Sequence, residues 1–203
     1  MKKIYLFSAT PNPKALHVNT LDFDFFQPII NFSNYDYLVL TSKKAVDALQ
    51  FYKKEEYIDI PALCISKFTK EYYEKFNGKI LDIGDGIGSN LQAIIDTYPK
   101  DKKWLYLRAK EIAGDGLHVD EAIVYESRCS DEILNFKLDN KDAILIFTSP
   151  SSVRCFLQNN SLHVEQKVIV IGTTTAKALP TKINYKISDK TSIKSCLELA
   201  TKF

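Results

Sequence analysis

The stretch YLVLTSKKAVDAL, residues 37–49, decides the fold of this chain because the sequence contains it twice. The second copy, ILIFTSPSSVRCFL, occupies residues 144–157. In both copies a short apolar run ends at a Thr-Ser pair, and the apolar residues that follow take helical spacing. Thr41-Ser42 and Thr148-Ser149 are therefore predicted to lie where a buried strand turns into a helix.

The repeat extends beyond these two segments. Three further pairs match, in the order expected of a duplication: residues 60–73 with 166–179, residues 86–95 with 192–200, and residues 2–10 with 102–110. The chain is therefore interpreted as two related halves of about one hundred residues, each a small unit of alternating strands and helices. The predicted fold class is α/β, with a small parallel sheet in each domain.

Two extended segments, residues 23–32 and 116–128, occupy corresponding places in the halves and alternate as half-buried strands do. If they pair as an antiparallel ribbon, the chain leaves one domain along the first and returns along the second. The predicted division is a discontinuous domain of residues 1–21 and 130–203, an inserted domain of residues 33–116, and a two-stranded linker of residues 22–32 and 117–129.

Composition argues against several classes of function. A hydrophobic content of 45% and a formal charge of +2 indicate an ordinary globular protein, with no bulk nucleic-acid binding. The first apolar run stops at Phe7 and is followed by Pro11 and Pro13, which favours a strand over a signal peptide. No apolar stretch reaches bilayer length. We therefore expect a cytoplasmic monomer with no membrane or nucleic-acid partner.

The four cysteines, Cys64, Cys129, Cys155 and Cys196, are scattered singly. There is no Cys-x-x-Cys sequence and no histidine at metal-ligand spacing. Reduced thiols and the absence of a metal site are the prediction.

Residues 84–88, Gly-Asp-Gly-Ile-Gly, resemble a dinucleotide-binding fingerprint, but the third glycine comes one residue early. The matching part of the second copy has no glycine. A tight loop is the preferred interpretation, and the absence of a phosphate-binding motif argues against a nucleotide-dependent enzyme.

Serine and threonine residues gather at the predicted strand ends, where open α/β sheets bind ligands. Their hydroxyls cap the first free N–H groups of a helix, and those same N–H groups can hold an anion instead. Without further information, helix capping alone is the simpler interpretation. The candidate substrate-binding residues are Thr41, Ser42, Lys43, Ser66, Thr148, Ser149, Ser151, Ser152, Gly172, Thr173, Thr174, Thr175 and Lys177.

Four motifs together resemble the uroporphyrinogen-III synthase family. They are LTSKKAVDAL from Leu40, VYES at residues 124–127, FTSPSSV at residues 147–153 and VIGTTTAKAL at residues 170–179. The resemblance covers nearly the whole chain and implies two α/β domains with a two-stranded linker and a cleft between them. The chain departs from the family where Ser8-Ala9-Thr10 replaces a common Thr-Arg pair, and whether Lys14 supplies the missing charge stays open.

The resemblance implies a lyase that cyclises hydroxymethylbilane, a linear tetrapyrrole with four acetate and four propionate side chains, to uroporphyrinogen III. Ring D is inverted through a spirocyclic intermediate, and the ring A hydroxyl leaves as water. Positioning and a general acid are the main requirements. No cofactor is implied. Transient contact with the enzyme that produces hydroxymethylbilane is a further expectation.

Tyr125 matches the tyrosine of the family's linker and is the candidate catalytic residue. A phenol is protonated at neutral pH and can donate to a departing hydroxyl. The alternative is that Tyr125 is an ordinary strand residue, since the chain has eleven tyrosines. A second hypothesis for the whole chain is a non-catalytic two-lobed sensor that binds a small anionic metabolite, because the same strand-end hydroxyls would serve it.

Overall fold

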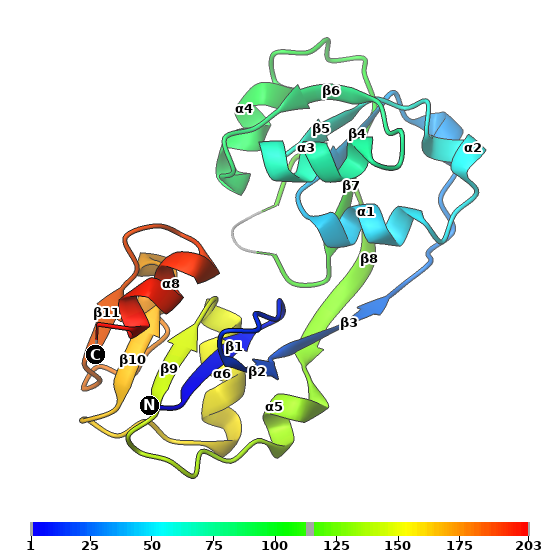
Figure 1. Ribbon diagram of the computed structural model, residues 1–203. Coiled ribbons are helices and arrows are strands. Elements are labelled where there is room, and N and C mark those ends of the chain that lie inside the picture. Colours follow the sequence, from blue (N-terminus) through cyan, green and yellow to red (C-terminus); the bar gives the residue numbers. More distant parts are fainter. Residues whose placement is uncertain (1, 113–115, 203) are drawn as a thin grey trace. The chain divides into compact units, whose positions relative to one another are not determined.

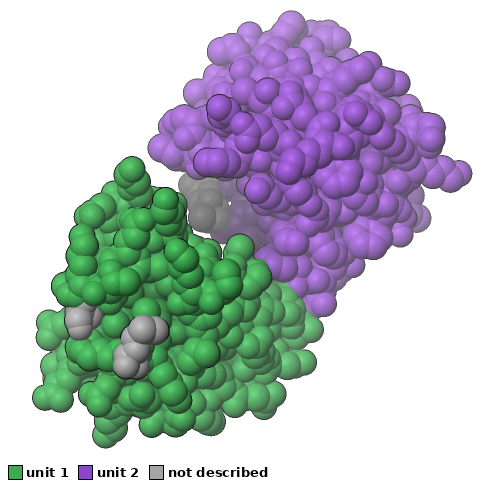
Figure 2. Space-filling model, in the orientation of Figure 1, with its two compact units in different colours: residues 1–22, 128–203 green, residues 23–127 purple. Residues whose placement is uncertain are grey.

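The computed structural model describes residues 2–112 and 116–202. Residues 1, 113–115 and 203, which the predicted domain ranges include, lie outside them. The chain divides into two compact units, residues 1–22 with 128–203 (unit 1) and residues 23–127 (unit 2). Figure 1 shows the elements and Figure 2 colours the two units.

Unit 1 is a five-stranded parallel sheet in the order β11-β10-β9-β1-β2. Alternate residues of its strands point to opposite faces: Phe7 of β1 joins the core on the side of α6, while Leu6 joins the core on the side of α8. The strands are β1 (Ile4–Ser8), β2 (Leu16–Asn19), β9 (Ile144–Phe147), β10 (Lys167–Val170) and β11 (Tyr185–Ile187); the helices are α5 (Asp131–Asn135), α6 (Pro150–Asn159), α7 (Thr173–Ala176) and α8 (Ile193–Ala200).

Unit 2 contains a six-stranded sheet in the order β3-β8-β7-β4-β5-β6. One face carries α1 and α3, and the other carries α4. The strands are β3 (Leu21–Phe25), β4 (Tyr37–Leu40), β5 (Ala62–Cys64), β6 (Ile80–Ile83), β7 (Trp104–Ala109) and β8 (Asp120–Cys129); the helices are α1 (Lys43–Leu49), α2 (Lys54–Tyr57), α3 (Lys67–Glu74) and α4 (Leu91–Ile95), with short 3₁₀ turns at η1 (Phe32–Asn34) and η2 (Gly88–Asn90).

The two sheets share one topology, as the internal repeat predicts. Reading from β11 in unit 1 and from β6 in unit 2, the strands correspond in order, with β9 matching β4 and β1 matching β7. The parallel registers agree as well: Ile146 pairs with Leu6 in unit 1, and Val39 pairs with Tyr106 in unit 2. The predicted α/β class with parallel sheets is confirmed.

The segments predicted as a linker are shorter strands than expected. β3 ends at Phe25, three residues before Pro28, which has no N–H group for a sheet hydrogen bond. β8 begins only at Asp120 and pairs in parallel with β7. β3 lies beside β8 at the edge of the sheet, and the chain runs along the two strands in opposite directions (Figure 1).

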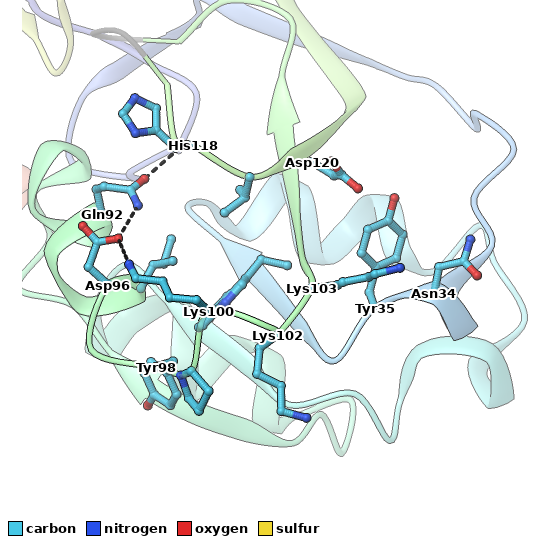
Figure 3. A pocket seen from close by; sticks show the side chains of 14 residues that line it. Asn34, Tyr35, Gln92, Asp96, Tyr98, Lys100, Lys102, Lys103, His118 and Asp120 are labelled. Atoms are coloured by element: carbon cyan, nitrogen blue, oxygen red, sulfur yellow. Dashed lines mark hydrogen bonds and ion pairs between the residues drawn. The ribbon is translucent and has the colours of Figure 1, made fainter.

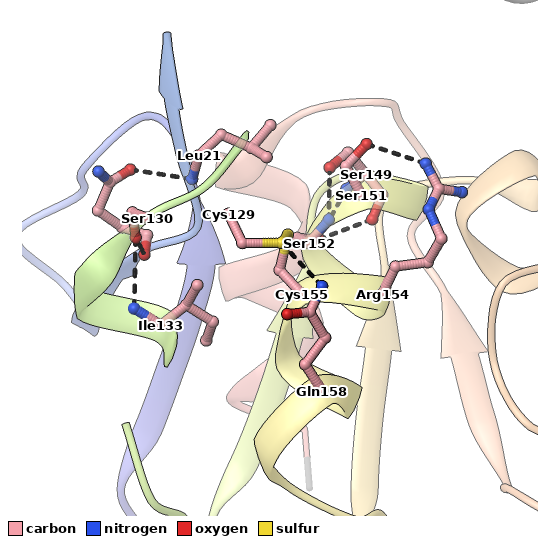
Figure 4. Close-up of a disulfide and its surroundings, with 11 residues drawn as sticks. Leu21, Cys129, Ser130, Ile133, Ser149, Ser151, Ser152, Arg154, Cys155 and Gln158 are labelled. Atoms are coloured by element: carbon pink, nitrogen blue, oxygen red, sulfur yellow. Dashed lines mark hydrogen bonds between the residues drawn. A yellow bond between two sulfur atoms is a disulfide. The ribbon is translucent and has the colours of Figure 1, made fainter. Parts of the chain in front are cut away.

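Cys129 and Cys155 form a disulfide with a Cα–Cα distance of 5.5 Å, so the prediction of reduced thiols is wrong for this pair. Cys129 ends β8 and Cys155 lies in α6 (Figure 4). Their sequence separation of 26 gave no sign of the contact, because only the return of β8 into unit 1 brings them together. Cys64 and Cys196 are free and buried. Among the described residues, no helix has the length and apolar character needed to cross a membrane.

We expect the replacement of both Cys129 and Cys155 by alanine to lower the free energy of unfolding by about 3 kcal/mol, because a crosslink over a loop of this length restricts the unfolded chain. Urea unfolding with and without a thiol reductant measures it. The reductant should bring the wild-type midpoint down to that of the double variant and leave the variant unchanged. A wild-type midpoint insensitive to reductant would contradict the prediction.

Candidate functional site

Thr41 and Ser42 follow β4 at the carboxyl end of the unit 2 sheet, and each hydroxyl meets a tyrosine. The alternation of β4 sends the two side chains to opposite faces. The Thr41 Oγ1 lies 3.0 Å from the Tyr106 hydroxyl, and the Ser42 Oγ lies 2.9 Å from the Tyr125 hydroxyl. Ser42 also accepts a hydrogen bond of 3.0 Å from the Ala45 N–H and so caps α1. Helix capping and a polar site therefore share one turn.

A β-bulge aims the Tyr125 side chain. In the pairing of β7 with β8 the register shifts between Arg108 and Ala109, so that Ala109 pairs with Tyr125 and Val124 is the extra residue. Without this bulge, Val124 and Tyr125 would point to opposite faces; with it, both pack in the core beneath α1 and α3. The Tyr125 hydroxyl consequently reaches Ser42.

Two neighbouring hollows lie at this end of the sheet. One, of about 410 Å³, is within the usual range for ligand pockets of about 300 to 1,000 Å³. Its apolar walls come from Ile65, Ile87 and Ile112, and both Tyr106 and Tyr125 line it. The other, of about 240 Å³, has Gln92 and His118 among its polar lining residues and no carboxylate among the described residues that line it. Thr41, Gly88, Ser89, Tyr106 and Ile112 line both hollows.

Both tyrosines stay protonated at neutral pH. Tyr106 is 6% exposed and Tyr125 is 9% exposed. Burial disfavours the charged phenolate and raises the pKa of each hydroxyl above its ordinary value of 10, an effect that the hydrogen bonds from Thr41 and Ser42 partly oppose. Each hydroxyl can therefore act as a hydrogen-bond donor or as a general acid.

The cations near this turn differ in availability. Lys43 is exposed at the start of α1, has no carboxylate partner among the described residues, and lies 5.3 Å from the ring centre of Tyr72. Arg108, in contrast, donates to the Glu121 carboxylate at 2.6 Å and to the carbonyls of Ala109 and Lys110. Lys43 is thus the cation that this turn offers to an anion, and Arg108 holds the end of β7 in place.

The glycine-rich segment 84–88 is a tight loop at the same end of the sheet. The Gly84 N–H donates to the Cys64 carbonyl and the Gly86 N–H to the Ile65 carbonyl, both at 2.8 Å. Gly86 has a φ of +94°, a conformation that favours glycine. The loop carries Gly88 and Ser89 to the hollows, and Ser66, on the adjacent turn, caps α3 by accepting from the Thr69 N–H.

In unit 1, the hydroxyl groups of the Thr148–Ser152 turn all have hydrogen-bond partners within the unit. Thr148 donates its hydroxyl to the Phe7 carbonyl at 3.2 Å. Ser149 and Ser152 form a capping box at the start of α6, and the Ser152 side chain is fully buried. Ser151 is half-buried and accepts a hydrogen bond of 3.2 Å from Arg154 (Figure 4). Ser151 is therefore the member of this group whose side chain is most available to a ligand.

The second turn of unit 1 is more open. Gly172 precedes α7, and a Cβ built there would meet nothing within 4 Å. Thr173, Thr174 and Lys177 are exposed, whereas Thr175 is 3% exposed and packs inward. Hydroxyls, open backbone and one cation thus lie together after β10.

The structure also places Lys14, whose role the sequence left open. Lys14 lines a hollow of about 360 Å³ with Ile4 and Leu197, at the beginning of β1. The Thr148 turn follows the opposite, carboxyl end of the neighbouring strands. Lys14 is therefore remote from the strand ends that carry the candidate site.

Sequence reasoning missed Tyr106. The signal that could have found it is a tyrosine hydroxyl within the otherwise apolar strand sequence WLYL.

A further hollow of about 580 Å³ lies at the amino end of β7 and is lined by three lysines, Trp104 and Tyr35, among others (Figure 3). Two of its lysines are engaged: Lys100 with Asp96 at 3.1 Å and Lys102 with Asp36 at 3.0 Å. Ligands of parallel α/β sheets bind at the opposite, carboxyl end, so this hollow is not part of the candidate site.

The described residues contain no cluster of metal-ligating side chains.

Two related α/β units with parallel strands and hydroxyl-rich turns at the carboxyl ends of those strands define a class of duplicated α/β proteins. The particular family follows from the sequence match: the family described as uroporphyrinogen-III synthase HemD matches residues 14–198. The chain belongs to this family. No curated protein matches the sequence.

Two solved structures are similar to this chain over nearly their whole length. The uroporphyrinogen-III synthetase of Helicobacter pylori is similar over 100% of this chain and 99% of its own, with 27% identity and a TM-score of 0.83. A mutant uroporphyrinogen III synthase of Thermus thermophilus is similar over 100% and 98%, with 14% identity and a TM-score of 0.63, a likeness of fold.

We expect Gly84→Ala to lower the free energy of unfolding by about 1 to 3 kcal/mol, because its Cβ would lie 2.8 Å from the Ile65 carbonyl oxygen and 2.8 Å from a methyl of Leu91. Gly88→Ala is the matched control in the same loop, since a Cβ there meets nothing within 4 Å. Urea unfolding compares the two. Equal midpoints for both variants would show that Gly84 is not tightly packed.

Proposed function

We propose that this protein is a uroporphyrinogen-III synthase, a lyase that cyclises hydroxymethylbilane with inversion of ring D and loss of water. The observation that carries the proposal is Tyr125, which lines a hollow at the carboxyl end of the parallel strands and whose protonated hydroxyl is hydrogen-bonded to Ser42. Membership of the family supports the reaction type.

The chemistry requires little from the protein beyond positioning and one proton. The ring A hydroxyl leaves as water when its oxygen receives a proton, and the electron-rich pyrrole supplies the electrons for that step. The substituted carbon of ring D then attacks the resulting methylene carbon to form the spirocyclic intermediate. The bond between ring D and its old bridge breaks, re-forms at the other α-carbon, and a proton leaves. Tyr125 is proposed as the donor for the first step or as the group that orients the leaving hydroxyl.

Eight carboxylates are proposed to be held by hydroxyls, backbone N–H groups and few cations. Each hydrogen bond to a charged group contributes about 1.5 to 3 kcal/mol, so a handful suffices without a basic surface. In unit 2 the proposed donors are at Thr41, Ser42, Lys43 and Ser66. In unit 1 they are Thr148, Ser149, Ser151, Ser152, Gly172, Thr173, Thr174, Thr175 and Lys177, where the buried Ser152 and Thr175 would contribute only through the backbone.

The proposal includes no cofactor, a cytoplasmic monomer, and transient contact with the enzyme that supplies hydroxymethylbilane. A reducing compartment favours the free thiols of Cys129 and Cys155 over the disulfide. The redox state of the Cys129–Cys155 pair in cells is therefore a test of the proposed cytoplasmic location of the protein.

The test is to incubate the protein with freshly prepared hydroxymethylbilane, oxidise the products and separate the uroporphyrin isomers by chromatography. Type III product in excess of the spontaneous reaction is expected. Type I product alone, at the spontaneous rate, would reject the enzyme and favour a non-catalytic sensor for an anionic metabolite.

Tyr125→Phe is expected to slow type III formation by a few fold to about a hundredfold without abolishing it. General acids typically contribute about 10² to 10⁴, and the pyrrole already assists departure of the hydroxyl. The rate of type III formation measures the effect. Tyr52→Phe is the matched control, because the Tyr52 hydroxyl donates to the Pro28 carbonyl in the same unit but lines neither hollow. Wild-type turnover in the Tyr125 variant would make Tyr125 a structural residue.

Thr174→Phe is expected to lower type III formation at least tenfold while the fold survives, because residue 174 is exposed and a phenyl ring would fill the open turn after β10. The control is Thr181→Phe, an exposed threonine of unit 1 before β11. Activity assays with circular dichroism of both variants provide the measurement. Full activity of the Thr174 variant would place the substrate away from this turn.

A further inference from the structure

Tyr106 is a buried tyrosine with its hydroxyl at the boundary of both hollows of unit 2. Its ring packs with Leu91, Ile95 and Trp104 in the core on the α4 side of the sheet. Its hydroxyl reaches Thr41 Oγ1 at 3.0 Å, and both residues line both hollows. Packing of the ring therefore needs no hydroxyl, and phenylalanine would fill the same core.

The two hydroxyls together have one donor to spare. Each carries one hydrogen, and one of the two is used in the bond between them, whichever atom donates. Neither hydroxyl has another hydrogen-bond partner among the described residues. The remaining hydrogen is available to a ligand in the hollows.

The two hollows differ in chemistry. The one beside Tyr125 has three isoleucines and suits the flat, apolar face of a pyrrole ring. The one toward His118 has no carboxylate in the described part of its lining, and the polar residues Gln92 and His118 line it and not the first, which suits an anionic side chain. Glu111, in contrast, lines only the first hollow, where it would repel an anion. The Thr41–Tyr106 pair lies where a ring and its carboxylate arm would join.

We propose that Thr41 and Tyr106 together bind one carboxylate side chain of a substrate pyrrole and so position that ring beside Tyr125. Tyr106 is thus a positioning residue for the reaction proposed above, and this inference rests on that function. Because either hydroxyl can supply the spare hydrogen, the loss of one leaves the other able to donate to the carboxylate.

This redundancy gives the test. Thr41→Val and Tyr106→Phe are expected to weaken the affinity for uroporphyrinogen III, and to raise KM, by about two- to threefold each, whereas the double variant loses the whole charge-assisted bond, about ten- to a hundredfold. If the bond between the two residues were only structural, each single substitution would already break it, and the double variant would behave like the singles. That outcome would overturn the proposal.

Calorimetric binding of uroporphyrinogen III, kept reduced, separates this inference from the proposed activity. Tyr52→Phe again controls for loss of a half-buried, hydrogen-bonded tyrosine hydroxyl, and thermal unfolding checks that each variant folds. A wild-type protein that binds the probe but forms no type III product, with weak binding only in the double variant, would reject the enzyme and keep the binding pair. A wild-type protein that forms type III product, with a double variant that binds the probe no more weakly than the single variants, would keep the enzyme and reject the binding pair.

Discussion

The carboxyl ends of parallel strands must meet at one edge of a sheet, and this constraint governs both units of the protein. At that edge each strand changes into a loop or helix, and the first N–H groups of a helix have no backbone partner. The side chains of Ser42, Ser66 and Ser149 satisfy these groups in three of the turns. Helix capping therefore gathers hydroxyl groups at the carboxyl end of the strands. Hydrogen-bond donors gathered in this way are the main requirement of a site for a polyanion.

The hydroxyl pairs of unit 2 illustrate how such an edge acquires chemistry. A buried phenol without a hydrogen-bond partner costs free energy, and Tyr106 and Tyr125 both find partners at the Thr41-Ser42 turn. The bulge before Tyr125 is necessary for this, since regular pairing would turn the ring to the other face of the sheet. The same burial keeps both phenols protonated. Burial is therefore the reason both that each tyrosine hydroxyl is hydrogen-bonded and that it keeps its proton to donate.

The sequence predicted the duplicated parallel α/β architecture because apolar runs ending at Thr-Ser are local signals. It also predicted that the segment 84–88 is a tight loop. It did not predict the Cys129–Cys155 disulfide, the bulge at Val124 or the partners of Thr41 and Ser42. These depend on which strands become neighbours and in which register, and a repeat pattern does not carry that information. The importance of Tyr106 depends on the same information, because its hydroxyl meets Thr41 only when β7 lies beside β4.

Comparison of the two copies shows where they have diverged. The repeat and the strand registers place Leu6 of unit 1 where unit 2 has Tyr106, and Thr148 where unit 2 has Thr41. With no phenol to meet, the Thr148 hydroxyl donates to the Phe7 carbonyl and is used within the fold. The Thr41 hydroxyl instead meets a second hydroxyl, which leaves one hydrogen to spare at the hollows. A leucine in one copy of the strand and a tyrosine in the other thus separate a turn whose threonine hydroxyl is used within the fold from a turn whose hydroxyl pair keeps one hydrogen to donate. This difference is why we assign the positioning of the reacting ring to unit 2.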